Sequence, residues 1–123
     1  MEFNQYNTTV QQWIHTVLEN RETNADVVLE CCRDIIAYGR KTDDPKLMGF
    51  GFFYGGEIYY ELNDGAHFFH MMTEALTYLD RAEEWELVVR CYNFLGIASM
   101  SRGNPSLALD YYMNGLKDSD TYD

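Results

Sequence analysis

Apolar side chains recur along most of the chain at the three- and four-residue spacing of one helix face. Between residues 25 and 38, for example, Val28, Cys32 and Ile35 form such a stripe. No stretch alternates cleanly between apolar and polar positions, as a half-buried strand would. The pattern predicts six helices, at about residues 9–20, 25–38, 45–62, 66–81, 84–102 and 105–117.

Capping and helix-breaking residues mark the predicted helix ends. Asn24 is the predicted N-cap of the second helix, and Asp44-Pro45 and Asn104-Pro105 each place a capping side chain directly before a proline in the first turn. Gly39 and Gly103 predict the ends of the second and fifth helices, and the polar residues 118–123 are expected to form a tail. Because every connection is short, consecutive helices must fold back on one another. The predicted fold class is all-α: one domain of six helices in three antiparallel hairpins, at about 9–38, 45–81 and 84–117.

The chain repeats itself with an offset of 40 residues, since Gly56 aligns with Gly96 and Met72 aligns with Tyr112. Small residues in one helix let the backbone of its partner approach, and large residues fill the space beside them. When the 40-residue offset is applied towards the N-terminus, only the second helix of the first predicted hairpin aligns with the repeat. The sequence therefore predicts two clear repeats and a degenerate N-terminal one, as is common at the ends of repeat arrays.

The last predicted hairpin carries a recognisable set of residues, namely Tyr92, Leu95, Gly96, Gly103, Ala108, Tyr112 and Gly115. In this order the hairpin resembles a tetratricopeptide repeat (TPR), with two departures: Ser99 stands where the family has an aromatic residue, and Gly115 where it has alanine. The resemblance implies a TPR-like right-handed α-solenoid. The family repeats every 34 residues or so, so an offset of 40 implies longer helices or longer turns here.

The acidic, aromatic-rich chain as a whole also resembles the N-terminal repeat region of cytosolic bacterial diguanylate cyclases, the GGDEF-type signalling proteins. The cyclase signature, Gly-Gly-Asp/Glu-Glu-Phe, does not occur in these 123 residues. The resemblance implies a non-catalytic sensory or binding module, cut from a longer protein, that controls an attached cyclase domain. The alternatives are the peptide-sensing domain of a transcriptional regulator and a stand-alone interaction scaffold.

The net charge of the chain limits the classes of partner that it can bind. Lys and Arg number 9 against 20 Asp and Glu, a formal charge of −11, which argues against binding nucleic acid or an anionic membrane surface. The N-terminus lacks the basic and apolar segments of a signal peptide, and the most apolar stretch is too short to span a bilayer, so we expect a cytoplasmic protein. Three cysteines, Cys31, Cys32 and Cys91, form a poor disulfide framework and predict buried thiols.

Candidate catalytic and ligand motifs are weak. His67, His70 and Glu74 share a helix face and could contribute to a metal site, but an ordinary helix surface explains them as well. The glycines of residues 49–56 lack the lysine and the preceding strand of a phosphate loop, and they predict close helix packing or a ligand-sensitive kink. No nucleophile or triad pattern is visible. We therefore expect no catalytic residue, no metal and no cofactor, and a protein that is not an enzyme.

The remaining candidate site is the concave face, which the first helices of the hairpins line in a helical solenoid. Its predicted residues are Phe50, Phe53, Glu57, Tyr60, Glu61, Arg90, Asn93, Ile97 and Met100. Aromatic and arginine side chains beside carboxylates suit an extended peptide or protein segment with some positive charge. In the alternative interpretation, Phe50, Phe53 and Tyr60 are buried against the first hairpin. Besides that partner we expect either a homodimer or an attached catalytic domain.

Overall fold

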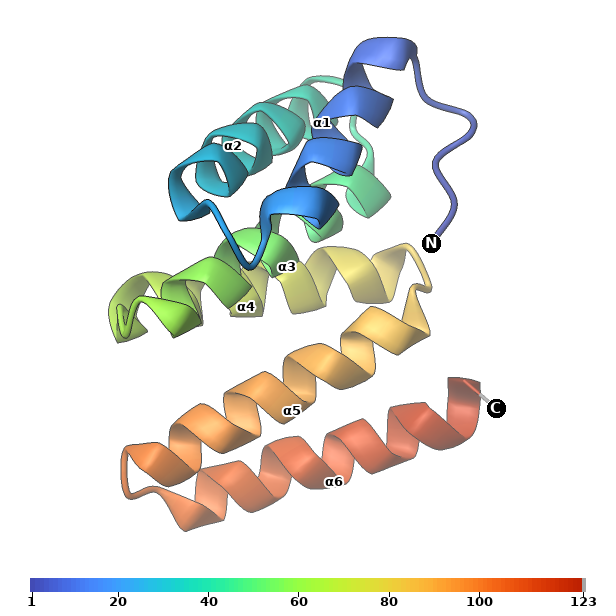
Figure 1. The fold of residues 1–123 in the computed structure, drawn as a ribbon. Helices are drawn as coiled ribbons and strands as arrows, with labels where there is room; N and C mark the ends of the chain where they lie inside the picture. Colours follow the sequence, from blue (N-terminus) through green and yellow to red (C-terminus); the bar gives the residue numbers. More distant parts are fainter. Residues whose placement is uncertain (123) are drawn as a thin grey trace.

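The computed structural model describes residues 1–122, with side chains for residues 1–119, and this part of the chain forms six helices and no strand. The fold class is therefore all-α, as the sequence predicts. Each helix packs on its neighbours in the chain, so the helices follow one another from one end of the molecule to the other (Figure 1). The helices are α1 (Thr8–Asn20), α2 (Ala25–Lys41), α3 (Pro45–Glu61), α4 (Gly65–Arg81), α5 (Trp85–Ser101) and α6 (Pro105–Tyr122).

The four turns from α2 to α6 share one backbone geometry. Each contains a residue in the left-handed region: Asp43 at φ 51°, Asn63 at 58°, Glu83 at 57° and Gly103 at 76°. The amide of the next residue then donates to a carbonyl five positions back, as Asp44 does to Gly39 at 2.8 Å. This is the helix-ending motif that left-handed residues commonly form. Because the turn is identical each time, α2 to α6 begin every 20 residues, at Ala25, Pro45, Gly65, Trp85 and Pro105.

The predicted capping residues are confirmed. The side chain of Asn24 accepts a hydrogen bond from the amide of Val27, and Asp44 accepts one from Leu47, with Pro45 in the first turn of α3. The 40-residue offset is explained by helix length, because α2, α3, α4 and α5 each have 17 residues and the turns between them stay short.

Two predicted helix ends are wrong. Gly39 does not end α2, which continues to Lys41; the left-handed residue is Asp43, and Gly39 is buried where α3 approaches. The sixth helix does not end near residue 117 but runs to Tyr122, because neither glycine nor proline follows Gly115 to break it. The expected polar tail is thus mostly helical.

The core is centred on α3, in which residues 47–58 are all buried. Its glycines make this possible. A Cβ added at Gly51 would lie 2.6 Å from Cγ1 of Ile36 and 3.1 Å from the carbonyl oxygen of Cys32, both in α2. A Cβ added at Gly56 would lie 3.0 Å from Cε of Met72 in α4. The glycine-rich segment therefore brings α3 close to α2 and α4, and the predicted close helix packing is confirmed.

The 40-residue register reappears in these contacts. A Cβ at Gly96 would meet the ring of Tyr112 at 2.6 Å, and a Cβ at Gly56 would meet Met72, the residue that aligns with Tyr112. The same small-to-large contact therefore joins α3 to α4 and α5 to α6. In Figure 1 the second of these pairs lies side by side and antiparallel, at the end of the molecule opposite to α1 and α2.

Candidate functional site

Two of the predicted concave-face residues are inaccessible to a ligand. Phe50 is 1% exposed and Phe53 is fully buried. The ring of Phe53 lies 6.0 Å from that of Phe94 in α5, in an edge-to-face arrangement. These two aromatic residues therefore belong to the core, in agreement with the alternative interpretation, although α5 and the N-terminal segment supply contacts that the first hairpin was expected to make.

The N-terminal segment covers Phe50. The ring of Phe3 packs edge to face on Phe50 with centroids 5.2 Å apart, and the ammonium group of Lys46 lies 4.9 Å from the centre of the Phe3 ring. Lys46 also donates a hydrogen bond to the carbonyl oxygen of Glu2. Residues 1–6 thus occupy the space over the start of α3. Nothing in the periodicity of the sequence indicated this contact, because the segment precedes the first helix.

The other predicted residues differ in accessibility. Tyr60 is half-buried and packs on Phe94, while Arg90 is partly exposed. Four residues are open to solvent, namely Glu61, Asn93, Ile97 and Met100.

Glu57 lies at the centre of an ion-pair network. Its carboxylate accepts two hydrogen bonds from Arg21, from Nε at 2.8 Å and from Nη2 at 2.6 Å, and one from Nη2 of Arg90 at 3.4 Å. Glu57 is only 8% exposed, so its charge needs these partners. The network joins the turn after α1 to α3 and α5. The sequence reasoning included Glu57 and Arg90 but missed Arg21.

Tyr54 and Phe53 hold the two guanidinium groups in place. Arg21 lies 5.0 Å from the centre of the Tyr54 ring, and Arg90 lies 4.9 Å from that of Phe53. Burial raises the pKa of Tyr54, although the nearby cations of Arg21 and Arg90 oppose the shift. Hydrogen bonding to Glu57 raises the pKa of Arg21 despite partial burial. Tyr54 therefore stays neutral and Arg21 charged.

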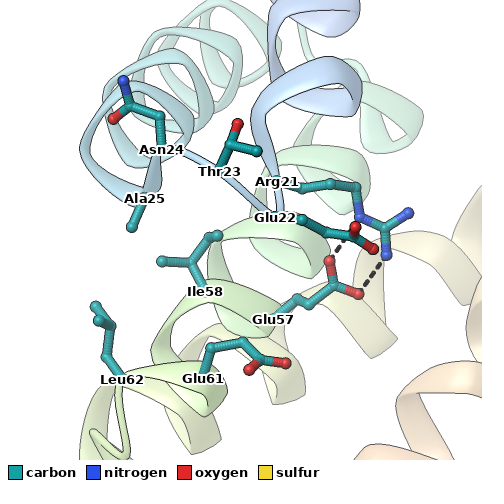
Figure 2. A pocket seen from close by; sticks show the side chains of 9 residues that line it. All are labelled: Arg21, Glu22, Thr23, Asn24, Ala25, Glu57, Ile58, Glu61 and Leu62. Atoms are coloured by element: carbon teal, nitrogen blue, oxygen red, sulfur yellow. Dashed lines mark hydrogen bonds and ion pairs between the residues drawn. The ribbon is translucent and has the colours of Figure 1, made fainter.

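A pocket of about 540 Å³ opens beside this network (Figure 2). Its lining residues are Arg21, Glu22, Thr23, Asn24, Ala25, Glu57, Ile58, Glu61 and Leu62. Three carboxylates and one guanidinium give the lining a formal charge of −2. The carboxylate of Glu57 is already paired with Arg21 and Arg90. Glu61, by contrast, has no ion-pair partner among the side chains of residues 1–119. The pocket therefore offers negative charge beside an apolar wall.

The histidines have local partners. Nδ1 of His67 lies 2.8 Å from the Asp64 carboxylate, and its ring stacks on Tyr59 at 4.7 Å. The ring of His70 packs edge to face on Phe52. Among the described residues, no group of three or more His, Cys, Asp or Glu side chains is placed to hold a metal ion. Backbone and side-chain hydrogen bonds from His67 lower the pKa of Asp64.

No family model, curated protein or solved structure matches the chain. None of the helices in the described part of the chain combines the length and apolar character needed to cross a membrane.

Proposed function

We propose that this chain is a non-catalytic binding module that holds a positively charged segment of a peptide or protein. The observation that carries the proposal is the pocket between the α1–α2 turn and α3, whose lining combines the carboxylates of Glu22 and Glu61 with the apolar side chains of Ala25, Ile58 and Leu62. Leu62 is 55% exposed, so its side chain is accessible to a ligand. A lysine or arginine side chain fits such a site, with its aliphatic stem on the apolar wall and its charge on a carboxylate.

The charge network makes this site rigid. Glu57 is fixed by Arg21 and Arg90, and these arginines are fixed by aromatic rings. An entering cation therefore finds the carboxylate of Glu61 on a helix that is already ordered, which lowers the entropic cost of binding.

We further propose that the six helices form three TPR-like hairpins stacked as a right-handed array. The repeated turn, the 20-residue spacing of the helices and the packing of each helix on its chain neighbours support this arrangement.

Fluorescence anisotropy with a labelled peptide tests the binding proposal. The probe is Ser-Lys-Leu-Lys-Phe-Ser, compared with the same peptide carrying glutamate at both lysine positions. We expect the lysine peptide to bind and the double variant Glu22→Gln/Glu61→Gln to bind it at least about fivefold more weakly.

The control is the double variant Glu30→Gln/Asp34→Asn, which removes the same charge from exposed positions on α2. A general attraction of the acidic chain for cations would weaken binding equally in both double variants and would overturn the proposal. Equal binding of the lysine and glutamate peptides would overturn it as well.

The cellular role is a separate proposal that rests on the sequence resemblance: the module regulates an attached diguanylate cyclase domain in a cytosolic bacterial signalling protein. The same pocket would serve a peptide-sensing domain of a transcriptional regulator or a stand-alone scaffold. The reading frame beyond the codon for Asp123 distinguishes these, since a cyclase domain in frame supports the first and a frame without one contradicts it.

A further inference from the structure

One face of α6 is apolar and open to solvent. Leu109 is 60% exposed, Met113 is 58% exposed and Leu116 is 64% exposed, at the four- and three-residue spacing of one helical stripe. The adjacent face of α6, about 100° around the helix, packs on α5 through Ala108 and Gly115, which are buried. Isolated exposed apolar side chains are common, but three on one stripe indicate an interaction surface.

The internal repeat allows this surface to be compared with the equivalent positions of α3 and α4, which contact α5. Several contacts cross from α3 and α4 to α5 and its C-cap. Among them, Glu57 pairs with Arg90, Tyr60 packs on Phe94, and Phe69 lies under the guanidinium group of the C-cap residue Arg102.

Moving forward by 40 residues from Glu57, Tyr60 and Phe69 leads to Ile97, Met100 and Leu109. These are 43%, 53% and 60% exposed. These three positions are therefore occupied in α5 and α6 by large apolar side chains that are open to solvent. Phe53 and Phe68, which also contact Phe94, correspond instead to the exposed Asn93 and the buried Ala108. We call these five residues, Ile97, Met100, Leu109, Met113 and Leu116, the end face.

We propose that the end face binds the end face of a second copy of this chain, as a two-fold symmetric dimer. The equivalent positions Glu57, Tyr60 and Phe69 contact α5 or its C-cap, and a second copy presents two helices with the same exposed apolar side chains. A face that is apolar on both partners satisfies the self-complementarity that a two-fold interface requires.

The other end of the molecule argues against head-to-tail stacking. The outer side of α1 exposes polar residues, namely Gln11, Gln12, His15 and Glu19, with Leu18 as its one exposed leucine. Docking the end face of one copy on α1 of the next would bury these polar groups against apolar side chains. The symmetric arrangement avoids this cost.

The size and charge of the chain predict a weak dimer. A helix of 18 residues is about 27 Å long and two adjacent helices are about 20 Å wide, so two end faces bury on the order of 1,000 Å², near the lower limit for a specific interface. Each copy also carries a formal charge of −11, and the repulsion between copies weakens as salt screens it. Association should therefore be visible at micromolar concentrations and should strengthen with salt.

Sedimentation velocity of the 123-residue chain from about 5 to about 200 micromolar tests the proposal. We expect the mass to rise from 14.4 kDa toward twice that value and no further. The variant Leu116→Glu should stay monomeric, and the matched variant Leu18→Glu, a leucine 42% exposed on α1, should dimerise as the natural chain does. Circular dichroism checks that both variants fold, and Met113→Glu replaces Leu116→Glu if the latter does not.

A natural chain that remains monomeric at about 200 micromolar would overturn the proposal. So would equal loss of dimer in Leu116→Glu and Leu18→Glu, or masses that grow beyond two copies, which indicate head-to-tail stacking. None of these results bears on the pocket, because Glu22 and Glu61 lie outside the end face.

Discussion

Arg21 and Glu57, 36 residues apart in sequence, form a two-pronged ion pair with N–O distances of 2.8 and 2.6 Å. Arg21 is the residue that follows the last turn of α1, and Glu57 lies in the fourth turn of α3 from its start. The pair connects the turn between α1 and α2 to the central helix α3 and lines one side of the pocket. Both the stability of the fold and the shape of the site depend on it.

Removal of the guanidinium group should destabilise the protein. In Arg21→Ala, the mostly buried carboxylate of Glu57 keeps only the longer contact with Arg90, so we expect a loss of about 2 kcal/mol in the free energy of unfolding. Urea unfolding followed by circular dichroism measures it. The double variant Arg21→Ala/Glu57→Gln should lose less than the two single variants together, because no unpaired charge is left buried. Strict additivity would contradict the pairing.

Glycine at position 83, in the turn before α5, should stabilise the protein. Glu83 has a φ of 57°, which costs an ordinary side chain about 1 kcal/mol that glycine does not incur. Glu83→Gly should therefore raise the thermal midpoint, with a gain of about 1 kcal/mol. The control Glu86→Gly places the same change in the first turn of α5 and should lower stability. Similar losses in both variants would show that residue 83 is not left-handed.

Two glycine-to-alanine changes should have opposite outcomes. At Gly51 the added methyl group meets Ile36 and the backbone of α2, so overpacking of about 1–3 kcal/mol should outweigh the better helix propensity of alanine. At Gly65 the nearest atom is the end of the flexible Arg102 side chain, which can move away, so the change should be neutral or stabilising. Thermal unfolding of both variants checks this. A stable Gly51→Ala variant would mean that α3 does not approach α2 so closely.

The three thiols should differ in reactivity. Burial raises the pKa of Cys32 and of Cys91 far above the usual range, and it raises the pKa of the half-buried Cys31 as well. The thiolate is the reactive form, so iodoacetamide at about pH 8 should label Cys31 first and faster as the pH rises. Cys32 and Cys91 should react only when the fold opens. Mass spectrometry of digested protein reports the order, and early labelling of Cys32 would contradict its burial.

The sequence was sufficient for the local features of the fold. Helix existence followed from apolar spacing, and the caps at Asn24 and Asp44 followed from the side chains that prefer those positions. The left-handed residue Glu83 could not be recognised, because the turn forces it into a conformation that glutamate rarely adopts. Gly39 was mistaken for a terminator because a glycine needed for close packing looks the same in sequence as one needed for a turn.

The site was predicted less well because it depends on long-range contacts. Glu57 and Glu61 were found from helix register, but Arg21 comes from a connection with no periodicity. Phe50 and Phe53 were placed on the accessible face by register, and they are buried because Phe3 and Phe94 cover them. Helix periodicity indicates which residues share a face and does not indicate what covers that face.

Titration of the lysine peptide into ¹⁵N-labelled protein, followed through the amide resonances, shows whether the pocket beside Glu57 binds a positively charged segment. Binding there should perturb amides that cluster at residues 21–25 and 57–62, which line the pocket. Perturbations that cluster elsewhere, or none at concentrations where the anisotropy indicates binding, would contradict binding at this site.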